Sequence, residues 1–323
     1  MDISIIIVNH RSWKPLEVCL DSISEITSPK LKFEVIIVDN FSNDGLFDHF
    51  VNKYSNFIFI KNNSNTGFSN GCNIGAKNAK GSYLFFLNTD TTISLNALSI
   101  LYETYKKYPE IGILSCLQID KKNHYFNQKK IFPSFTQVLG ITRFFYRKLN
   151  KKRLQKKFNT HDNLFYPDWV TGSVIFISKD WFQKVNEWDD DYWLYFEDVA
   201  ICKKIAQNKG KIAVTRDVTI FHEHGGASRI DFETECISKT EVIISNHVYI
   251  NNHFNSFNKN ISHFLLIIGI LSEKIILSFL SLFLFLNLKL KTNKYILRNL
   301  CLYYYNATKK QTWLSPRSVN YQK

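Results

Sequence analysis

The sequence contains no Cys-x-x-Cys pair, although it has six cysteines. Cysteines scattered in this way favour neither a disulfide framework nor a thiolate zinc site, so both classes of protein are excluded. We therefore expect a reducing, cytosolic compartment. The six are Cys19, Cys72, Cys116, Cys202, Cys236 and Cys301.

The N-terminus lacks the features of an ordinary signal peptide. Met1–Val8 contains a short apolar run, but no basic region precedes it and no small-residue cleavage site follows it. We interpret these residues as the first strand of a sheet.

The charge balance is strongly basic, with a net charge of +13 that indicates an anionic partner. Nucleic acid, nucleotide phosphates and an acidic membrane surface all fit this charge. A general richness in Lys, Asn, Ile and Phe is an alternative explanation that involves no partner. The sequence contains no RNA- or DNA-binding motif, which leaves nucleic acid without further support.

Short apolar runs alternate with helical patterns over the first 120 residues, which is typical of β-α units and a mainly parallel sheet. The spacing of apolar residues predicts a helix that opens at Pro15 and two more at Asn70–Ala79 and Leu95–Tyr105. A chain of 323 residues is long enough for one such domain and an appendage. The predicted strands are Ile3–Val8, Phe33–Val38, Phe57–Ile60 and Tyr83–Leu87.

Acidic residues follow two of these strands. Asp39 ends the second strand, and Asp90 follows the fourth in Asn88-Thr89-Asp90. Because ligands of such sheets bind at the carboxyl ends of the strands, both carboxylates are expected to face one crevice. One carboxylate there can bind a nucleoside, and the other Mg²⁺ or Mn²⁺ on a diphosphate. For either residue alone, a simple turn role is the alternative.

A second polar region follows Pro167. A strand is predicted at Val174–Ile177, and a helix is predicted from Lys179 onward. The segment Trp188–Asp198 then combines aromatic residues with five carboxylates. This composition suits stacking against a sugar and deprotonation of its hydroxyl group.

Taken in order, these motifs resemble glycosyltransferase family 2, and within it the rhamnosyltransferase-like branch. The resemblance covers about residues 3–228 and implies a GT-A fold, inversion at the anomeric carbon, a thymidine or uridine diphosphate sugar donor, and a bound Mg²⁺ or Mn²⁺. The motifs are Ile7-Val8-Asn9-His10, Val38-Asp39-Asn40, Asn65 to Asn73, Asn88-Thr89-Asp90, Thr171-Gly172-Ser173, Tyr195-Phe196-Glu197-Asp198, and His222 with Gly225 to Ser228.

On the donor side, the resemblance implies that Asp39 contacts the pyrimidine ring and that Asp90 binds the metal. Asn88 stands where the family's Asp-x-Asp motif begins, so its amide is expected to bind the sugar or the ribose. The segment Asn65–Asn73 resembles the loop that shapes the donor site, with Gly67 allowing close backbone approach. The implied donor-binding residues are Asn9, Asp39, Asn40, Asn65, Gly67, Asn88 and Asp90.

On the acceptor side, Asp198 matches the general base of the family. Glu197 is expected to contact the acceptor or to orient its loop, with an exposed helix carboxylate as the alternative. His222 is placed beside the metal or the diphosphate, whereas His224 is given a structural role. Where the family usually has Gly-Gly-Phe-Asp, this chain has Asn186–Asp189, so acceptor specificity stays open. The implied acceptor residues are Trp169, Gly172, Trp193 and Tyr195.

Two further segments favour a membrane surface. Arg143–Lys157 has the pattern of a basic amphipathic helix, for which a solvated charged face is the alternative. Phe264–Leu286 is almost wholly apolar, but Glu273 and Lys274 interrupt it, and each piece is too short to span a bilayer. We favour helices lying in the membrane interface over packing on the catalytic domain and over a true span.

The combined prediction is an α/β protein of GT-A fold, with a mixed, mainly parallel sheet flanked by helices and a helical, membrane-associating tail. The predicted function is inverting transfer, best matched by rhamnose from dTDP-rhamnose, to a lipid-linked or polysaccharide acceptor in lipopolysaccharide, O-antigen or capsule synthesis at the inner face of the membrane. The alternatives are a UDP-galactose or UDP-N-acetylglucosamine transferase and a non-catalytic membrane- or nucleic-acid-binding protein. The oligomeric state is left open. The predicted regions are 1–230 (donor half 1–120, basic insertion 121–167, acceptor half 168–230) and the helical region 231–323.

Overall fold

The computed structural model describes residues 1–28, 30–138, 140–158, 163–223, 231–283 and 288–322. The chain divides into two compact units. The first, here called the sheet unit, consists of residues 1–132, 156–189 and 197–227. The second, the helical unit, consists of residues 133–155, 190–196 and 228–323.

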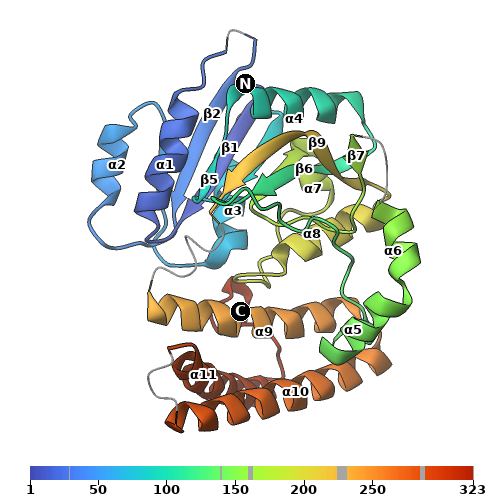
Figure 1. The fold of residues 1–323 in the computed structure, drawn as a ribbon. Helices are drawn as coiled ribbons and strands as arrows, with labels where there is room; N and C mark the ends of the chain where they lie inside the picture. Colours follow the sequence, from blue (N-terminus) through green and yellow to red (C-terminus); the bar gives the residue numbers. More distant parts are fainter. Residues whose placement is uncertain (29, 139, 159–162, 224–230, 284–287, 323) are drawn as a thin grey trace. The chain divides into compact units, whose positions relative to one another are not determined.

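The sheet unit is built on one mixed sheet, which has nine strands in the described part of the chain (Figure 1). Its order is β3-β2-β1-β4-β8-β6-β9-β5, and β7 also pairs with β9. The first four strands in this order are parallel, and β8 enters antiparallel between β4 and β6. The strands are β1 (Ile3–Asn9), β2 (Phe33–Asp39), β3 (Ile58–Lys61), β4 (Tyr83–Leu87), β5 (Thr91–Thr92), β6 (Ile111–Ile119), β7 (Leu164–Phe165), β8 (Val174–Ser178) and β9 (Lys211–His222).

Helices cover both faces of this sheet. Alternate residues of a strand point to opposite faces, so Ile5 and Ile7 pack in the cluster that contains the buried faces of α1 and α4. Ile6 and Val8 lie on the other face, close to α3. Burial on both faces explains why the central strands are continuous apolar runs. The helices are α1 (Trp13–Ser24), α2 (Phe47–Lys53), α3 (Gly67–Asn78), α4 (Leu95–Lys107), α7 (Lys179–Lys184) and α8 (Glu197–Gln207).

The helical unit contains three long helices that pack on one another. Val138 joins Ile250 and Leu266 in one buried cluster, and Ile244 joins Tyr303 and Ala307 in another. The long helices are α9 (Phe232–His253), α10 (Ser256–Phe283) and α11 (Leu288–Lys310). The shorter elements are α5 (Gly140–Leu149), α6 (Lys151–Phe158), which contains a boundary between the units, and the 3-10 turns Phe135–Gln137 and Val319–Gln322.

The GT-A type of fold predicted from the sequence is confirmed, including the mixed, mainly parallel sheet and an apolar helix near the C-terminus. The long strand β6 and the two-residue strands β5 and β7 were not predicted.

The grouping of segments differs from the predicted regions. Residues 133–155 and 190–196, which were predicted to belong to the catalytic domain, group with the helical unit. The reason for the first segment is local packing, because Val138 is buried with Ile250 and Leu266. Residues 264–283 of the predicted apolar stretch lie in one continuous helix, α10, in which Glu273 and Lys274 make an ion pair of 2.7 Å, and residues 284–286 of the prediction lie outside the described residues.

Candidate active site

One edge of the candidate site is formed where β5 pairs with β9. The antiparallel register places Thr91 opposite His222, and the Glu223 amide donates to the Asp90 carbonyl at 2.8 Å. This register brings His222 Nε2 to 3.2 Å from Asp90 Oδ1, and both side chains are buried. Residues far apart in the sequence thus present a carboxylate and an imidazole to each other.

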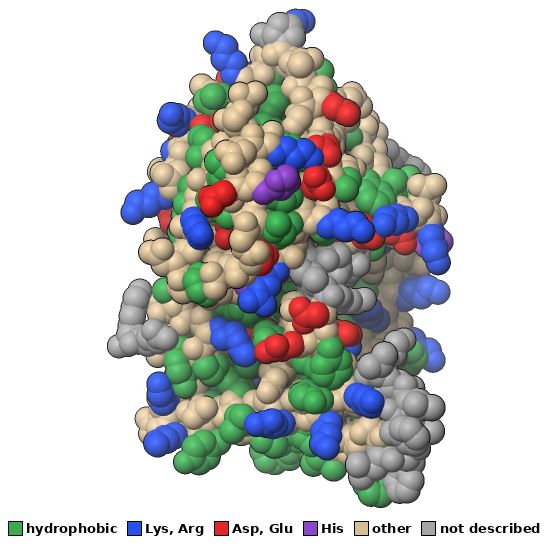
Figure 2. Space-filling view, turned by 90° about the vertical axis from the view of Figure 1, so that its left-hand side faces the viewer, with side chains coloured by type: hydrophobic (Ala, Val, Ile, Leu, Met, Phe, Trp, Pro, Cys, Tyr) green, Lys and Arg blue, Asp and Glu red, His purple; other side chains and the backbone are tan. Residues whose placement is uncertain are grey.

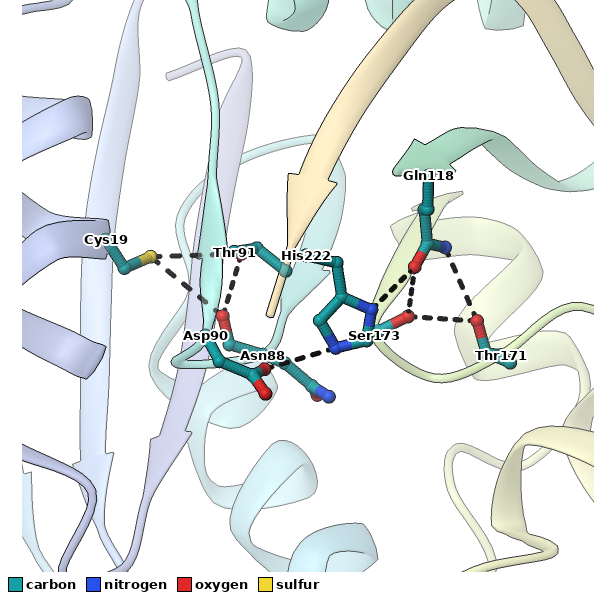
Figure 3. A network of polar contacts seen from close by, with 8 residues as sticks. All are labelled: Cys19, Asn88, Asp90, Thr91, Gln118, Thr171, Ser173 and His222. Atoms are coloured by element: carbon teal, nitrogen blue, oxygen red, sulfur yellow. Dashed lines mark hydrogen bonds and ion pairs between the residues drawn. The ribbon is translucent and has the colours of Figure 1, made fainter. Parts of the chain in front are cut away.

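Gln118 at the end of β6 orients the imidazole. Its Oε1 lies 2.9 Å from His222 Nδ1 and accepts from the Ser173 hydroxyl at 2.9 Å. Because this oxygen is an acceptor, Nδ1 carries the proton in the neutral ring, and the Nε2 lone pair faces Asp90. Figure 3 shows this network, with the side chains of Asn88 and Asp90 pointing to the same side.

The segment Thr171–Ser173 connects this edge to the predicted base. The backbone N–H of Asn88 donates to the backbone carbonyl of Ser173 at 3.1 Å. Between Thr171 and Ser173, the Gly172 amide donates to Asp198 Oδ2 at 3.1 Å. The three consecutive residues Thr171–Ser173 therefore contact Asn88 and Gln118, which lie beside the Asp90–His222 pair, and also the carboxylate of Asp198.

Asp198 lies in the first turn of α8, where its Oδ1 also accepts from the Val199 amide at 2.8 Å. Burial raises the pKa of this carboxyl to about 6, against the opposing effect of the two amide donors. A carboxylate with such a pKa is ionised at neutral pH and is a stronger base than an ordinary aspartate.

Glu197 is only 5% exposed, so the alternative of an exposed helix carboxylate is wrong. Burial, followed by the charge of Asp198, raises the pKa of Glu197 well above its ordinary value. Within the described residues its Oε2 is buried without a hydrogen-bond partner. Glu197 is thus shifted toward its neutral form, in which a carboxyl group can donate a hydrogen bond.

The predicted donor edge lies at the ends of β1 and β2. Asp39 is buried, and its Oδ2 accepts from the Ser42 amide at 3.2 Å while its Oδ1 accepts from the Ser42 hydroxyl. Asn9 Nδ2 donates to Asp39 Oδ1 at 3.3 Å. The structure therefore brings Asn9 and Asp39 together and holds the carboxylate in one orientation.

Asn40 supports the loop that precedes α3. Its Nδ2 donates to the Gly67 carbonyl at 2.9 Å and to Asn65 Oδ1 at 3.1 Å. Gly67 begins α3 with a φ of +88°, which side chains other than glycine rarely adopt. Gly71 packs so closely on Val8 that an added Cβ would lie 2.8 Å from Val8 Cγ1.

The predicted acceptor residues divide between the units. Trp169 belongs to the sheet unit, where its indole donates to the Ile131 carbonyl at 3.0 Å and Lys130 lies over its ring at 5.1 Å. Trp193 and Tyr195 belong to the helical unit. His224 and the motif Gly225 to Ser228 lie outside the described residues.

Gln118 and Ser173 were missed as functional candidates. Ser173 stands within the motif Thr171-Gly172-Ser173, so its sequence position could have identified it as a site residue. Gln118 lies in the unpredicted strand β6, and only the fold reveals that it contacts His222.

A mixed sheet of this order, with an aspartate after β4 and a histidine at the end of β9, defines a GT-A type of protein, and solved structures agree. Residues 4–171 match the family described as Glycosyl transferase family 2. The chain belongs to this family.

Curated relatives match over part of their length. The poly(ribitol-phosphate) beta-glucosyltransferase of Bacillus spizizenii is 35% identical over 111 residues, which are 33% of this chain and 18% of that protein. The poly-beta-1,6-N-acetyl-D-glucosamine synthase of Staphylococcus aureus is 29% identical over 98 residues, which are 29% of this chain and 24% of that protein. The matched segments thus span less than a third of these relatives.

Solved structures share the fold at low sequence identity. TarS of Staphylococcus aureus in complex with UDP-GlcNAc has a TM-score of 0.51 at 18% identity and covers 83% of this chain and 71% of that one. GalNAc-T7 with UDP, GalNAc and Mn²⁺ has a TM-score of 0.55 at 20% identity and covers 69% of this chain and 43% of that one.

Proposed function

We propose that this protein transfers a sugar, with inversion, from a nucleoside diphosphate donor to a hydroxyl group of a cell-surface glycan. The observation that carries the proposal is the Thr171–Ser173 segment. Its Gly172 amide donates to Asp198 at 3.1 Å, while its Ser173 contacts Asn88 and Gln118 beside the Asp90–His222 pair. One short segment thereby links the candidate base, Asp198, to the residues beside the candidate metal ligands Asp90 and His222.

Asp90 and His222 would hold Mg²⁺ or Mn²⁺. A group of three or more possible protein ligands does not occur among the described residues. Two protein ligands fit this use of a metal, because Mg²⁺ and similar ions on nucleotides take most of their ligands from phosphates and water. Gln118 Oε1 on Nδ1 leaves His222 Nε2 facing Asp90, and a ring nitrogen and a carboxylate that face each other fit a shared cation as well. When bound, the ion neutralises charge on the departing diphosphate.

Asp198 acts as the base in this proposal. With a pKa of about 6 it is ionised at neutral pH, and it accepts the proton of the acceptor hydroxyl as that oxygen attacks the anomeric carbon. Attack on the face opposite the diphosphate inverts the configuration. Glu197 is assigned to binding, because burial and the charge of Asp198 raise its pKa and favour the neutral carboxyl, which donates a hydrogen bond.

The donor is proposed to carry a uridine diphosphate, with Asp39 and Asn9 at the nucleoside. The names of the curated relatives point to glucose and N-acetylglucosamine, and TarS was solved with UDP-GlcNAc. We therefore place UDP-glucose and UDP-N-acetylglucosamine ahead of dTDP-rhamnose, which stays a prediction from the motif resemblance.

The helical unit is proposed to bind an anionic membrane surface from the cytoplasmic side. Within Ser256–Ser281 of α10, the most apolar stretch of 18 residues has a mean hydropathy of 2.0 and only 11% of it is buried, which also meets the length and composition of a membrane span. We favour an α10 that lies parallel to the membrane surface over one that spans the bilayer. The reason is that α10 packs along α11, whose lysines and arginine require water or lipid headgroups. On α5, Phe144, Phe145 and Leu149 are exposed next to basic residues. Apolar and basic side chains gather at the lower edge of Figure 2.

Binding of donors by the full chain tests the transferase proposal. We would measure thermal shifts with UDP-glucose, UDP-N-acetylglucosamine, UDP-galactose, dTDP-rhamnose and GDP-mannose, each with and without Mn²⁺. At 100 times Kd, a bound donor stabilises the fold by about 2.7 kcal/mol. Stabilisation by one donor that depends on Mn²⁺ supports the proposal. No response to any donor supports a non-catalytic membrane or nucleic-acid-binding role instead.

A further inference from the structure

Within the helical unit, the C-terminal segment Ser315–Asn320 lies against the loop Asp190–Phe196. The Ser318 hydroxyl donates to the Asp190 carbonyl at 2.8 Å. Asn320 Nδ2 donates to Asp191 Oδ1 at 2.9 Å. These bonds join positions that are 128 and 129 residues apart in the sequence.

Arg317 strengthens this attachment from the centre of the segment. Its Nη1 lies 3.0 Å from Glu241 Oε1 on α9, and Glu241 is fully buried. Its guanidinium group also lies over the Trp193 ring, 5.6 Å from the centroid. Arg317 therefore connects a buried carboxyl group on α9 to an aromatic residue of the loop.

α9 holds the same loop from a second direction. The Ser245 hydroxyl donates to the Leu194 carbonyl at 2.8 Å. The ring of Tyr249 lies 5.6 Å from that of Phe196. The loop is thus supported by a helix and by the C-terminal segment, both of which belong to its own unit.

The backbone of the loop requires such support. Tyr195 and Phe196 have φ angles of +70° and +67°, a left-handed conformation that bulky side chains rarely adopt. Strained residues of this kind persist only where surrounding contacts determine their conformation. The next residues in the sequence are Glu197 and Asp198, which return to the sheet unit.

We propose that the segment Ser315–Asn320 positions the loop Asp190–Phe196 for the transfer reaction, with Arg317 and Asn320 as positioning residues. This inference rests on the proposed function, in which Asp198 is the base and Trp193 and Tyr195 belong to the acceptor side. The loop ends at Phe196, and Asp198 stands two residues further along the sequence.

The experiment compares full-length Arg317→Ala and Asn320→Ala with Arg317→Lys, which keeps the charge opposite Glu241. Lys309→Ala, at an exposed position of α11, is the matched control. Amide hydrogen exchange of a peptide covering residues 190–197 is measured first. Release of UDP from UDP-glucose and UDP-N-acetylglucosamine in Mn²⁺ is then measured as kcat and donor KM.

We expect at least tenfold faster exchange in the 190–197 peptide of Arg317→Ala and Asn320→Ala, a fall of at least tenfold in kcat and an unchanged donor KM. Arg317→Lys restores much of both values, and Lys309→Ala matches the wild type. Unchanged exchange in the two alanine variants overturns the inference. Exchange that rises without a change in kcat also overturns it. A wild type that turns over neither donor counts against the proposed function, whereas the exchange result judges the attachment of the loop separately.

Discussion

Gln118 Oε1 accepts from His222 Nδ1 at 2.9 Å, and this contact directs the opposite ring nitrogen toward Asp90. Position 118 must therefore provide a hydrogen-bond acceptor for both the His222 ring and the Ser173 hydroxyl. Orienting partners of metal-binding histidines are worth about 10–100-fold in metal affinity or activity.

Gln118→Leu removes that acceptor. We expect Mn²⁺ affinity, measured by calorimetry in the presence of UDP, to fall about 10–100-fold. Two buried donors lose their partner as well, at a cost of about 1–3 kcal/mol in the free energy of unfolding. Gln118→Glu, which keeps the acceptor, should retain most of the affinity. Gln207→Leu on the exposed side of α8 is the control, and equal losses in both leucine variants would refute the role of Gln118.

Asp198→Asn keeps the shape of the side chain but cannot accept a proton at neutral pH. Donor turnover should fall by about 10²–10⁴, because this is the usual contribution of a general base. UDP binding, measured by calorimetry with Mn²⁺, should stay within twofold of the wild type. Normal turnover in this variant would remove Asp198 from the role of base.

Turnover should depend on pH through the same carboxyl group. Since the pKa of Asp198 is about 6, the rate is expected to be half-maximal near pH 6 and to fall at lower pH as the base becomes protonated. The measurement is kcat for UDP release between pH 5 and 8. A rate that is flat down to pH 5 would contradict the assignment.

Stability should change with pH in the opposite direction. Because burial raises the pKa of Asp198 above its ordinary value of 3.8, the folded protein keeps a proton that the unfolded chain releases. Ionisation of this group therefore costs stability as the pH rises from about 4 to 6. Asp198→Asn should be more stable than the wild type at pH 8 and nearly equal to it at pH 4, as measured by urea unfolding at each pH.

Gly67→Ala tests the loop that precedes α3. A Cβ at a φ of +88° costs about 1 kcal/mol or more, and relaxation of the strain moves the Gly67 carbonyl away from Asn40. UDP affinity should fall about tenfold. Gly45→Ala has a similar φ of +80° in open space and is the matched control. If both variants lose affinity equally, the effect is not specific to the donor loop.

Membrane binding should respond to the basic residues of the helical unit. Arg147, Lys148 and Lys152 are exposed, and each lysine or arginine near an anionic bilayer contributes about 1 kcal/mol. Changing all three to alanine should weaken binding to phosphatidylglycerol-containing vesicles about 100-fold in a flotation assay. Changing Lys77, Lys106 and Lys107 of the sheet unit is the control, and equal weakening would argue against a defined surface.

Much of the fold was predictable from local patterns. Strands such as Ile3–Asn9 are buried on both faces, so their apolar runs are unbroken, and the acidic residues at their ends stand out. β6 was missed because Ser115 and Gln118 interrupt its apolar pattern, and both polar residues are explained by tertiary contacts. Ser115 donates to the Val174 carbonyl at 2.7 Å, a partner that no local pattern reveals.

The candidate site was predictable where a residue stands in a motif, and not where the fold brings a residue from elsewhere. Asp90, Asp198 and His222 were chosen from motif positions. The raised pKa of Glu197 was not predictable, because it depends on the burial of its side chain and on the nearby charge of Asp198. Likewise, the division that places Trp193 and Tyr195 in the helical unit depends on contacts with residues more than fifty positions away in sequence.

The distance in sequence between the loop and its C-terminal support has a consequence for biosynthesis. A nascent chain emerges from the ribosome in order, and its domains fold as they become available. The sheet unit can begin to assemble once β9 has emerged, but Asp190 meets Ser318 only after another 128 residues have been made. A product interrupted within α10 or α11 would therefore keep Asp90, Asp198 and His222, while its loop lacked the hydrogen bonds from Ser318 and Asn320. Synthesis beyond Asn320 is thus a condition for a fully supported loop.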